Sequence, residues 1–279
     1  MSVWDKYESR IKSSGDSKYS AAFERERRMI EMKLPDNLSF ESVEVFASEY
    51  GFNITSEESQ SHKISQNVAI IDSDNLNEKS IYSLPGEDIE LGSLVVLDGC
   101  YWLVCERDHR SVLYTKAKLI QCNHLLKWVQ DGDIMSQWCI IEDGTKYMTG
   151  ELEDRHFIVT RGDARISMQI ARNKYTVRFD RENRFLIDDE DSPHKLSYIL
   201  TKPLKVGSLY NNKGVFKFVL QEATATGDDN HELGIADYYK YFTKSGEKIP
   251  IIEDGEADNK DNSQNENAPD ETNRKRVWF

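Results

Sequence analysis

Apolar and polar residues follow two different periods along this chain, and the period changes near residue 40. Before that point apolar residues recur three and four positions apart, which predicts amphipathic helices. We expect a short helix with Trp4 and Tyr7 on its apolar face, and a second helix that is capped by Asp16 or Ser17 and ends before a proline. Residues 1–36 are therefore predicted to form a helical segment.

The second helix carries Phe23 and Ile30 on its apolar side and a basic run, "RERR" at 25–28, on the other. A charged helix face is most often simply solvated, so the run alone predicts no partner. The alternative is contact with an acidic partner surface.

After residue 40 the pattern becomes that of short β-strands. The stretch "GSLVVLDGCYWLVCERD", residues 92–108, predicts a complete hairpin, because Asp98-Gly99 suits a type I′ turn with positive φ at both central positions. Both arms are apolar on both faces, so something must cover each face. One cover is the core, and the other is this chain, a substrate or a neighbouring protein.

Further predicted strands are separated by turn residues in the same way, with Asp-Gly turns again at 131–132 and 143–144. A polar loop or weak hairpin is expected at 47–66, and so many short strands are typical of sandwiches or small barrels. Apart from the hairpin, the expected β segments are 42–46, 67–71, 111–129, 134–141, 155–160, 164–170, 174–179, 184–188, 195–200 and 214–223.

The expected fold class is mainly β: an N-terminal helical arm, two small antiparallel β-barrel or sandwich modules, and an acidic C-terminal tail. A short helix is also expected at 230–242, ahead of the tail. The tail is polar and charged, which is typical of a flexible linker, and its tip "RKRVWF" fits either a disordered end or a docking peptide. The expected boundaries are 1–36, 37–130 for the first β-barrel module, 131–244 for the second and 245–279 for the tail.

Charge narrows the function classes. The net charge is −13, and residues 253–271 alone hold eight acidic residues and one lysine, so the rest is mildly acidic. General nucleic-acid binders need a basic surface to neutralise phosphates. No apolar run approaches the roughly 20 residues of a membrane span, and the first twelve residues contain no apolar core of a secretory signal.

Candidate metal chemistry is sparse. Without a secretory signal, Cys100, Cys105, Cys122 and Cys139 are expected to be free, packed thiols. These cysteines and His124 do not follow the spacing of a zinc site. We expect no metal and no cofactor.

Candidate catalytic chemistry is equally sparse. A β-rich hydrolase would have to use Glu151, Asp154 and His156, but charged residues are normal in turns, and no nucleophile-elbow, phosphate-loop or dinucleotide motif is present. We expect no enzyme and no catalytic residue. Lys116 and Lys118 share a strand face and form at most a weak DNA-facing stripe.

Three segments resemble a known family: "NVAIIDSDNLNEKSIYSLPGEDIELGSLVVLDGCYWLVCERD", "LIQCNHLLKWV" and "QWCIIEDGTKYMTGELEDRHFIVTRGDARI". They are similar to head-to-tail connector proteins, also called stopper or head-closure proteins, of tailed phages that infect Gram-positive bacteria. The resemblance runs from about Trp4 to Tyr241 and is most specific between Asn67 and Asp163. The polar segment 47–66 is longer than in this family.

The resemblance implies a structural ring subunit of the virion neck, assembled in the host cytoplasm, which joins head to tail and closes the DNA exit channel. Its partners would be copies of itself, portal or adaptor proteins, and tail-completion or tail proteins. Packaged DNA would contact only the channel, and no membrane would be involved. The second cover of the hairpin would then be a neighbouring subunit or the N-terminal helices.

Two alternatives stay open, namely another phage neck or tail component, such as an adaptor or tail-associated protein, and the β-rich hydrolase. The expected partner contacts are Trp4, Tyr7, Phe23, Ile30, Arg276, Trp278 and Phe279.

Overall fold

The computed structural model describes residues 3–13, 17–109, 113–143, 165–189, 191–206 and 209–249. The two expected helices are present as α1 (Val3–Ser13) and α2 (Lys18–Lys33).

Ser17 is the N-cap of α2. Its hydroxyl accepts a hydrogen bond from the backbone N–H of Ser20, whose hydroxyl accepts one from the N–H of Ser17 in return. This capping box satisfies two backbone donors that the first helical turn leaves without partners. At the other end, α2 stops at Leu34, because the residue before a proline disfavours helical geometry.

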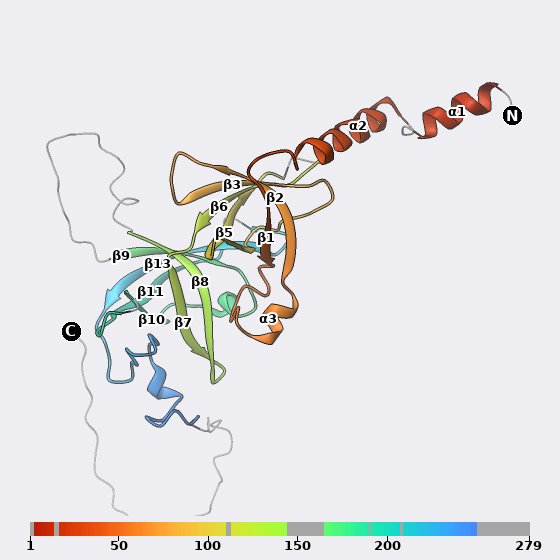
Figure 1. The fold of residues 1–279 in the computed structure, drawn as a ribbon. Coiled ribbons are helices and arrows are strands. Elements are labelled where there is room, and N and C mark those ends of the chain that lie inside the picture. The colour runs from red at the N-terminus through yellow and green to blue at the C-terminus, as the bar shows by residue number, and fades with distance from the viewer. Residues whose placement is uncertain are drawn as a thin grey trace, which may run out of the picture. The chain divides into compact units, whose positions relative to one another are not determined.

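Six antiparallel strands form a closed barrel in the order β1-β2-β3-β6-β5-β4 (Figure 1). Its interior is filled by apolar side chains such as Val68, Ile81 and Leu119, which are fully buried. The strands are β1 (Phe40–Phe46), β2 (Ile64–Asp72), β3 (Glu78–Ser83), β4 (Leu94–Leu97), β5 (Cys100–Arg107) and β6 (Lys116–Gln121).

A second antiparallel sheet, in the order β10-β11-β13-β9-β8-β7, curls into a nearly closed barrel around an aromatic core that includes Phe179, Phe185 and Phe218. The mainly β fold with two barrel modules is therefore confirmed, while the tail beyond residue 249 lies outside the described residues. The strands are β7 (His124–Gln130), β8 (Asp133–Asp143), β9 (Arg165–Ala171), β10 (Arg184–Ile187), β11 (Leu196–Leu204), β12 (Leu209–Tyr210), which pairs with β13, and β13 (Lys213–Ala223).

Asp-Gly turns form two of the hairpins as predicted. Asp98 and Gly99, between β4 and β5, have φ values of 51° and 72°, and Asp131 and Gly132, between β7 and β8, have 53° and 75°. Positive φ at both central residues is the type I′ geometry that matches strand twist.

Two elements of the structure differ from those predicted from the sequence. Residues 174–179 were expected to form a strand, but Thr176–Arg178 is the 3-10 turn η1, because the Asn173 side chain accepts hydrogen bonds from the N–H groups of Tyr175 and Thr176. The helix expected at 230–242 is reduced to the 3-10 turn η2 (Tyr238–Lys240). The strand expected at 155–160 lies outside the described residues.

The chain passes from one barrel to the other at Cys122 and Asn123, not at the expected boundary between 130 and 131. The run at 111–129 is two strands, because the Asn123 side chain donates to the carbonyl of Ile141 (2.7 Å) and accepts from its N–H (2.8 Å). The backbone thereby enters the second sheet, and the expected boundary falls within the hairpin of β7 and β8.

The outer face of the predicted hairpin packs on the second barrel of the same chain. Leu103 of β5 lies in one buried cluster with Ile140 of β8 and Val215 of β13, and the Tyr101 and Trp138 rings stack with centroids 4.6 Å apart. We call this cluster the shared core. The expectation that a neighbouring subunit or the N-terminal helices cover the hairpin is wrong, because the second barrel occupies that face.

The polar stretch at 47–66 also joins the barrels. It contains the helix α3 (Glu57–Ser61), and Phe52 is buried in the core of the second barrel, with its ring 4.7 Å from that of Tyr175. The Asn53 side chain accepts hydrogen bonds from the N–H (2.6 Å) and hydroxyl (3.0 Å) of Ser136. This stretch is therefore an ordered part of the junction.

Candidate partner-binding surface

The two aromatic residues predicted on the first helix lie at the surface. Trp4 is 76% exposed and Tyr7 is 59% exposed, and their rings meet edge to face with centroids 6.2 Å apart. Phe23 and Ile30 of α2 are half-buried. Of the predicted contact residues that the structure describes, Trp4 and Tyr7 therefore present the most apolar surface.

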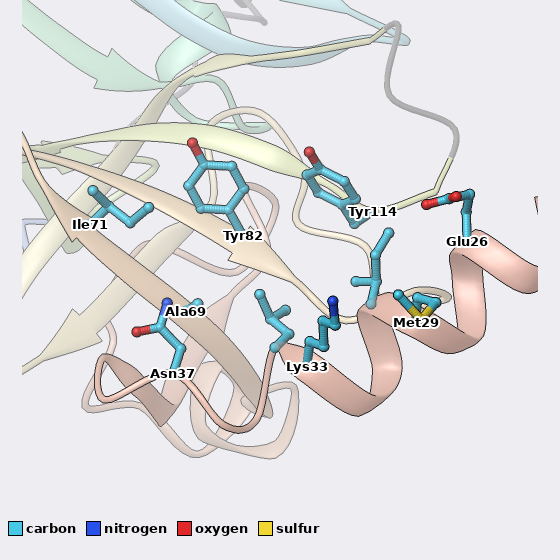
Figure 2. A pocket seen from close by; sticks show the side chains of 10 residues that line it. Glu26, Met29, Lys33, Asn37, Ala69, Ile71, Tyr82 and Tyr114 are labelled. Carbon is cyan, nitrogen blue, oxygen red and sulfur yellow. The ribbon is translucent and has the colours of Figure 1, made fainter.

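Beside α2, the outer face of the first barrel is hollowed into an apolar groove of about 380 Å³ (Figure 2). Met29 and Ile30 form its helical side, and Ile71 of β2, Tyr82 of β3 and Tyr114 form the barrel side. The two tyrosine rings lie side by side with centroids 5.9 Å apart. Met29 and Ile71 are 43% and 47% exposed, so the groove is open to a partner's side chains.

Charged groups flank the groove. Glu26 and Lys33 line it from α2, two helical turns apart. Lys116 extends its ammonium to 5.5 Å from the centre of the Tyr82 ring, a cation–π contact. In the basic run of α2, Arg27 pairs with Glu31 at 3.0 Å.

The two lysines of the weak DNA-facing stripe differ in their surroundings. Lys116 is exposed, whereas Lys118 forms an ion pair of 2.8 Å with Glu78. The hydrogen bond between Lys118 and Glu78 raises the pKa of the lysine and lowers the pKa of the glutamate. Since the Lys118 charge is already compensated, Lys116 is the cation of this pair that faces solvent.

All four thiols are free, as expected, and Cys105, Cys122 and Cys139 are buried. Burial raises the pKa of Cys105 to about 12 and raises the pKa of the other two buried thiols well above the ordinary range. Among the described residues, no group of three or more His, Cys, Asp or Glu side chains is arranged to hold a metal ion.

One ionic cluster is built into the second barrel. The Arg184 guanidinium contacts Asp229 at 2.8 Å and Asp237 at 2.9 Å, and the Asp229 side chain is completely buried. Burial alone would raise the pKa of Asp229, but hydrogen bonds from Arg184 and from the N–H groups of Thr226 and Asp237 outweigh it and lower the pKa. Every member is paired, so this cluster fastens the segment after β13 to β10.

Several predicted site residues lie outside the described part of the chain. They are the hydrolase candidates Glu151, Asp154 and His156 and the C-terminal contacts Arg276, Trp278 and Phe279.

The groove itself was missed by the sequence reasoning. Residues 67–71 were predicted only as a strand, and Tyr82 was not placed on any surface. The pattern that points to the groove is the spacing of residues 26, 29, 30, 33 and 34 along α2, which marks one helix face.

Together these features define a mainly β protein of two fused barrels, with apolar side chains exposed on α1 and along the groove. No family model, curated protein or solved structure matches the chain. None of the described helices is long and apolar enough to cross a membrane.

Proposed function

We propose that this chain is a non-enzymatic structural subunit of the neck of a tailed phage, where a ring of copies joins the head to the tail and closes the DNA exit channel. The subunit is assembled in the host cytoplasm and resides in the virion neck. Its partners are further copies of itself, portal or adaptor proteins, and tail-completion or tail proteins. Packaged DNA contacts only the channel, and no membrane takes part.

The resemblance of the segments between Asn67 and Asp163 supports the assignment to phage necks. The single observation that carries a role in an assembly is the distribution of exposed apolar side chains. Seven of the 17 large apolar residues exposed in the described part of the chain lie between residues 3 and 38. Apolar residues gathered in this way are typical of protein–protein contacts.

The barrels themselves are suited to a rigid ring subunit. The shared core and the Phe52 contact fix the two barrels to each other within one chain. A ring needs two different, complementary patches on each subunit, and α1 and the groove are two different apolar patches.

The test is electron microscopy of particles from a phage in which this gene is disrupted. We expect heads that lack tails and have lost their DNA, beside complete free tails. Tailless heads that retain DNA would contradict the closure role and favour an adaptor or tail-associated component. Normal, infectious tailed particles would reject the structural role and return attention to the carboxylates around Glu151.

A further inference from the structure

The apolar groove lies between a helix and a strand surface of the same chain. One of its sides is a helix face, residues 26, 29, 30 and 33 of α2 with its C-cap Leu34, and the opposite side is a strand surface that carries Ile71 and Tyr82. A helix lying in the groove would pack against both. The volume of about 380 Å³ is within the roughly 300–1,000 Å³ of pockets that bury most of a small molecule, which is enough for a large aromatic side chain.

The same chain carries a helix with the required aromatic residues. On α1, Trp4 and Tyr7 are three positions apart and thus share a face. Buried aromatic side chains contribute about 150–250 Å² each and dominate the energetics of interfaces. Because Trp4 and Tyr7 are mostly exposed, they gain much from entering an apolar groove.

Charge favours a contact between α1 of one copy and the barrels of another. The residues of α1, 3–13, hold three basic and two acidic residues, a net charge of +1, whereas residues 37–249 hold 24 basic and 34 acidic residues, a net charge of −10. Two barrel regions therefore repel each other, and α1 is not repelled by a barrel region. Locally, Glu8 lies one turn after Trp4 on the same face of α1, and Lys33 lines the groove.

We propose that α1 of one copy packs into the groove of a second copy, with Trp4 and Tyr7 against Ile71 and Tyr82. This inference rests on the proposed ring function, and it names the contact that would propagate the ring. The patches differ, so the contact is heterologous, and its repetition closes a ring when the rotation per subunit permits.

The test uses two variants of the full chain and one control, compared by sedimentation velocity over a range of concentrations. Trp4→Ala/Tyr7→Ala removes the aromatic residues of α1, and Ile71→Lys places a charge in the groove. The control, Leu76→Lys, changes an apolar residue that is 94% exposed and outside the groove. All changed side chains are at least half or nearly half exposed, so folding is expected to be preserved and is checked by circular dichroism.

We expect the wild type and Leu76→Lys to assemble beyond dimers, and each groove or α1 variant to associate at least about tenfold more weakly, as loss of a central aromatic contact entails. A mixture of the two variants is expected to give a one-to-one heterodimer and nothing larger, because each pair then retains a single competent α1–groove contact.

Three results would overturn the inference. A wild type that stays monomeric up to its solubility limit would mean that α1 does not join copies. If both variants assemble like the wild type, the α1–groove contact is refuted. The proposed ring function is not refuted by that result, because the particle experiment tests it separately. A mixture that fails to form heterodimers would show that α1 and the groove are not complementary.

Discussion

At the scale of single residues, the buried thiols are held in the neutral form by their surroundings. Because burial raises the pKa values of Cys105, Cys122 and Cys139, and because the thiolate is the nucleophile, these three thiols are expected to be unreactive in the folded protein. Only the partly exposed Cys100 is expected to react with iodoacetamide at pH 8. Peptide mass spectrometry before and after unfolding measures this, and rapid modification of native Cys122 would contradict it.

The Arg184 cluster supplies a second prediction at this scale. Arg184→Ala leaves the buried Asp229 carboxylate without its cation, and breaking a buried ion pair in this way costs about 3–5 kcal/mol. Arg178→Ala is the matched control, since its pair with Asp131 is exposed and screened by solvent, so its removal is expected to cost much less than the Arg184 change. Urea unfolding measures both variants, and equal losses would refute the structural role of Arg184.

The same cluster predicts a pH dependence. The pKa of Asp229 is lower in the folded protein than in the unfolded chain, where it is about 3.9. Its ionised form therefore stabilises the fold above about pH 4, and this contribution is lost as the pH falls through the folded pKa. Asp229→Asn is expected to destabilise the protein more at pH 6 than at pH 3. An equal loss in free energy of unfolding at both pH values would argue against this.

At the scale of elements, the junction between barrels depends on one close backbone approach. A Cβ at Gly92 would lie 2.3 Å from the carbonyl oxygen of Gly214, and the φ of Gly92 is +83°. Gly99, in the hairpin turn, has a φ of +72° but no neighbour within 4 Å of such a Cβ. Gly92→Ala is therefore expected to destabilise the protein more than Gly99→Ala, which costs about 1–2 kcal/mol of backbone strain. Thermal unfolding of the two variants decides the order.

Elements were predictable where a short sequence determines them. The Asp98-Gly99 turn and the Ser17 cap act over four residues, so the sequence alone indicates them. The misses occurred where a side chain redirects the backbone. Asn173 bonds the N–H groups of Tyr175 and Thr176, two and three positions away, and this local turn overrides the strand-like pattern of 174–179. Asn123 moves the chain between sheets through a bond to Ile141, 18 positions away, and such a long-range partner cannot be read from local periodicity.

At the scale of the whole molecule, the shared core is expected to make both barrels unfold together. Leu103 is fully buried in it, and Leu103→Ala is expected to cost about 2–5 kcal/mol. Because one cluster belongs to both barrels, the loss should lower the stability of each by the same amount. Hydrogen exchange of peptides from β3 and from β11 measures this, and unchanged protection of β11 would disprove the coupling.

The candidate site was predictable only in part at this scale. Helical periodicity was enough to single out Trp4 and Tyr7, and both side chains lie at the surface. The groove requires α2 to lie beside β2 and β3, which begin 31 or more positions after the end of α2, and no local pattern encodes that docking. For the same reason, the cover of the hairpin was assigned to a neighbouring subunit or the N-terminal helices instead of the second barrel.

The junction also determines the order in which parts of the protein can fold while the chain is being synthesised. The strands of the first barrel are complete at Gln121, but the shared core needs Val215, and Phe52 needs the second barrel around it. A ribosome adds about 5–20 residues per second, so roughly 5–20 s pass before those last strands emerge. Throughout that interval the nascent chain displays the apolar hairpin face and Phe52, and it is then that a chaperone has the most surface to protect.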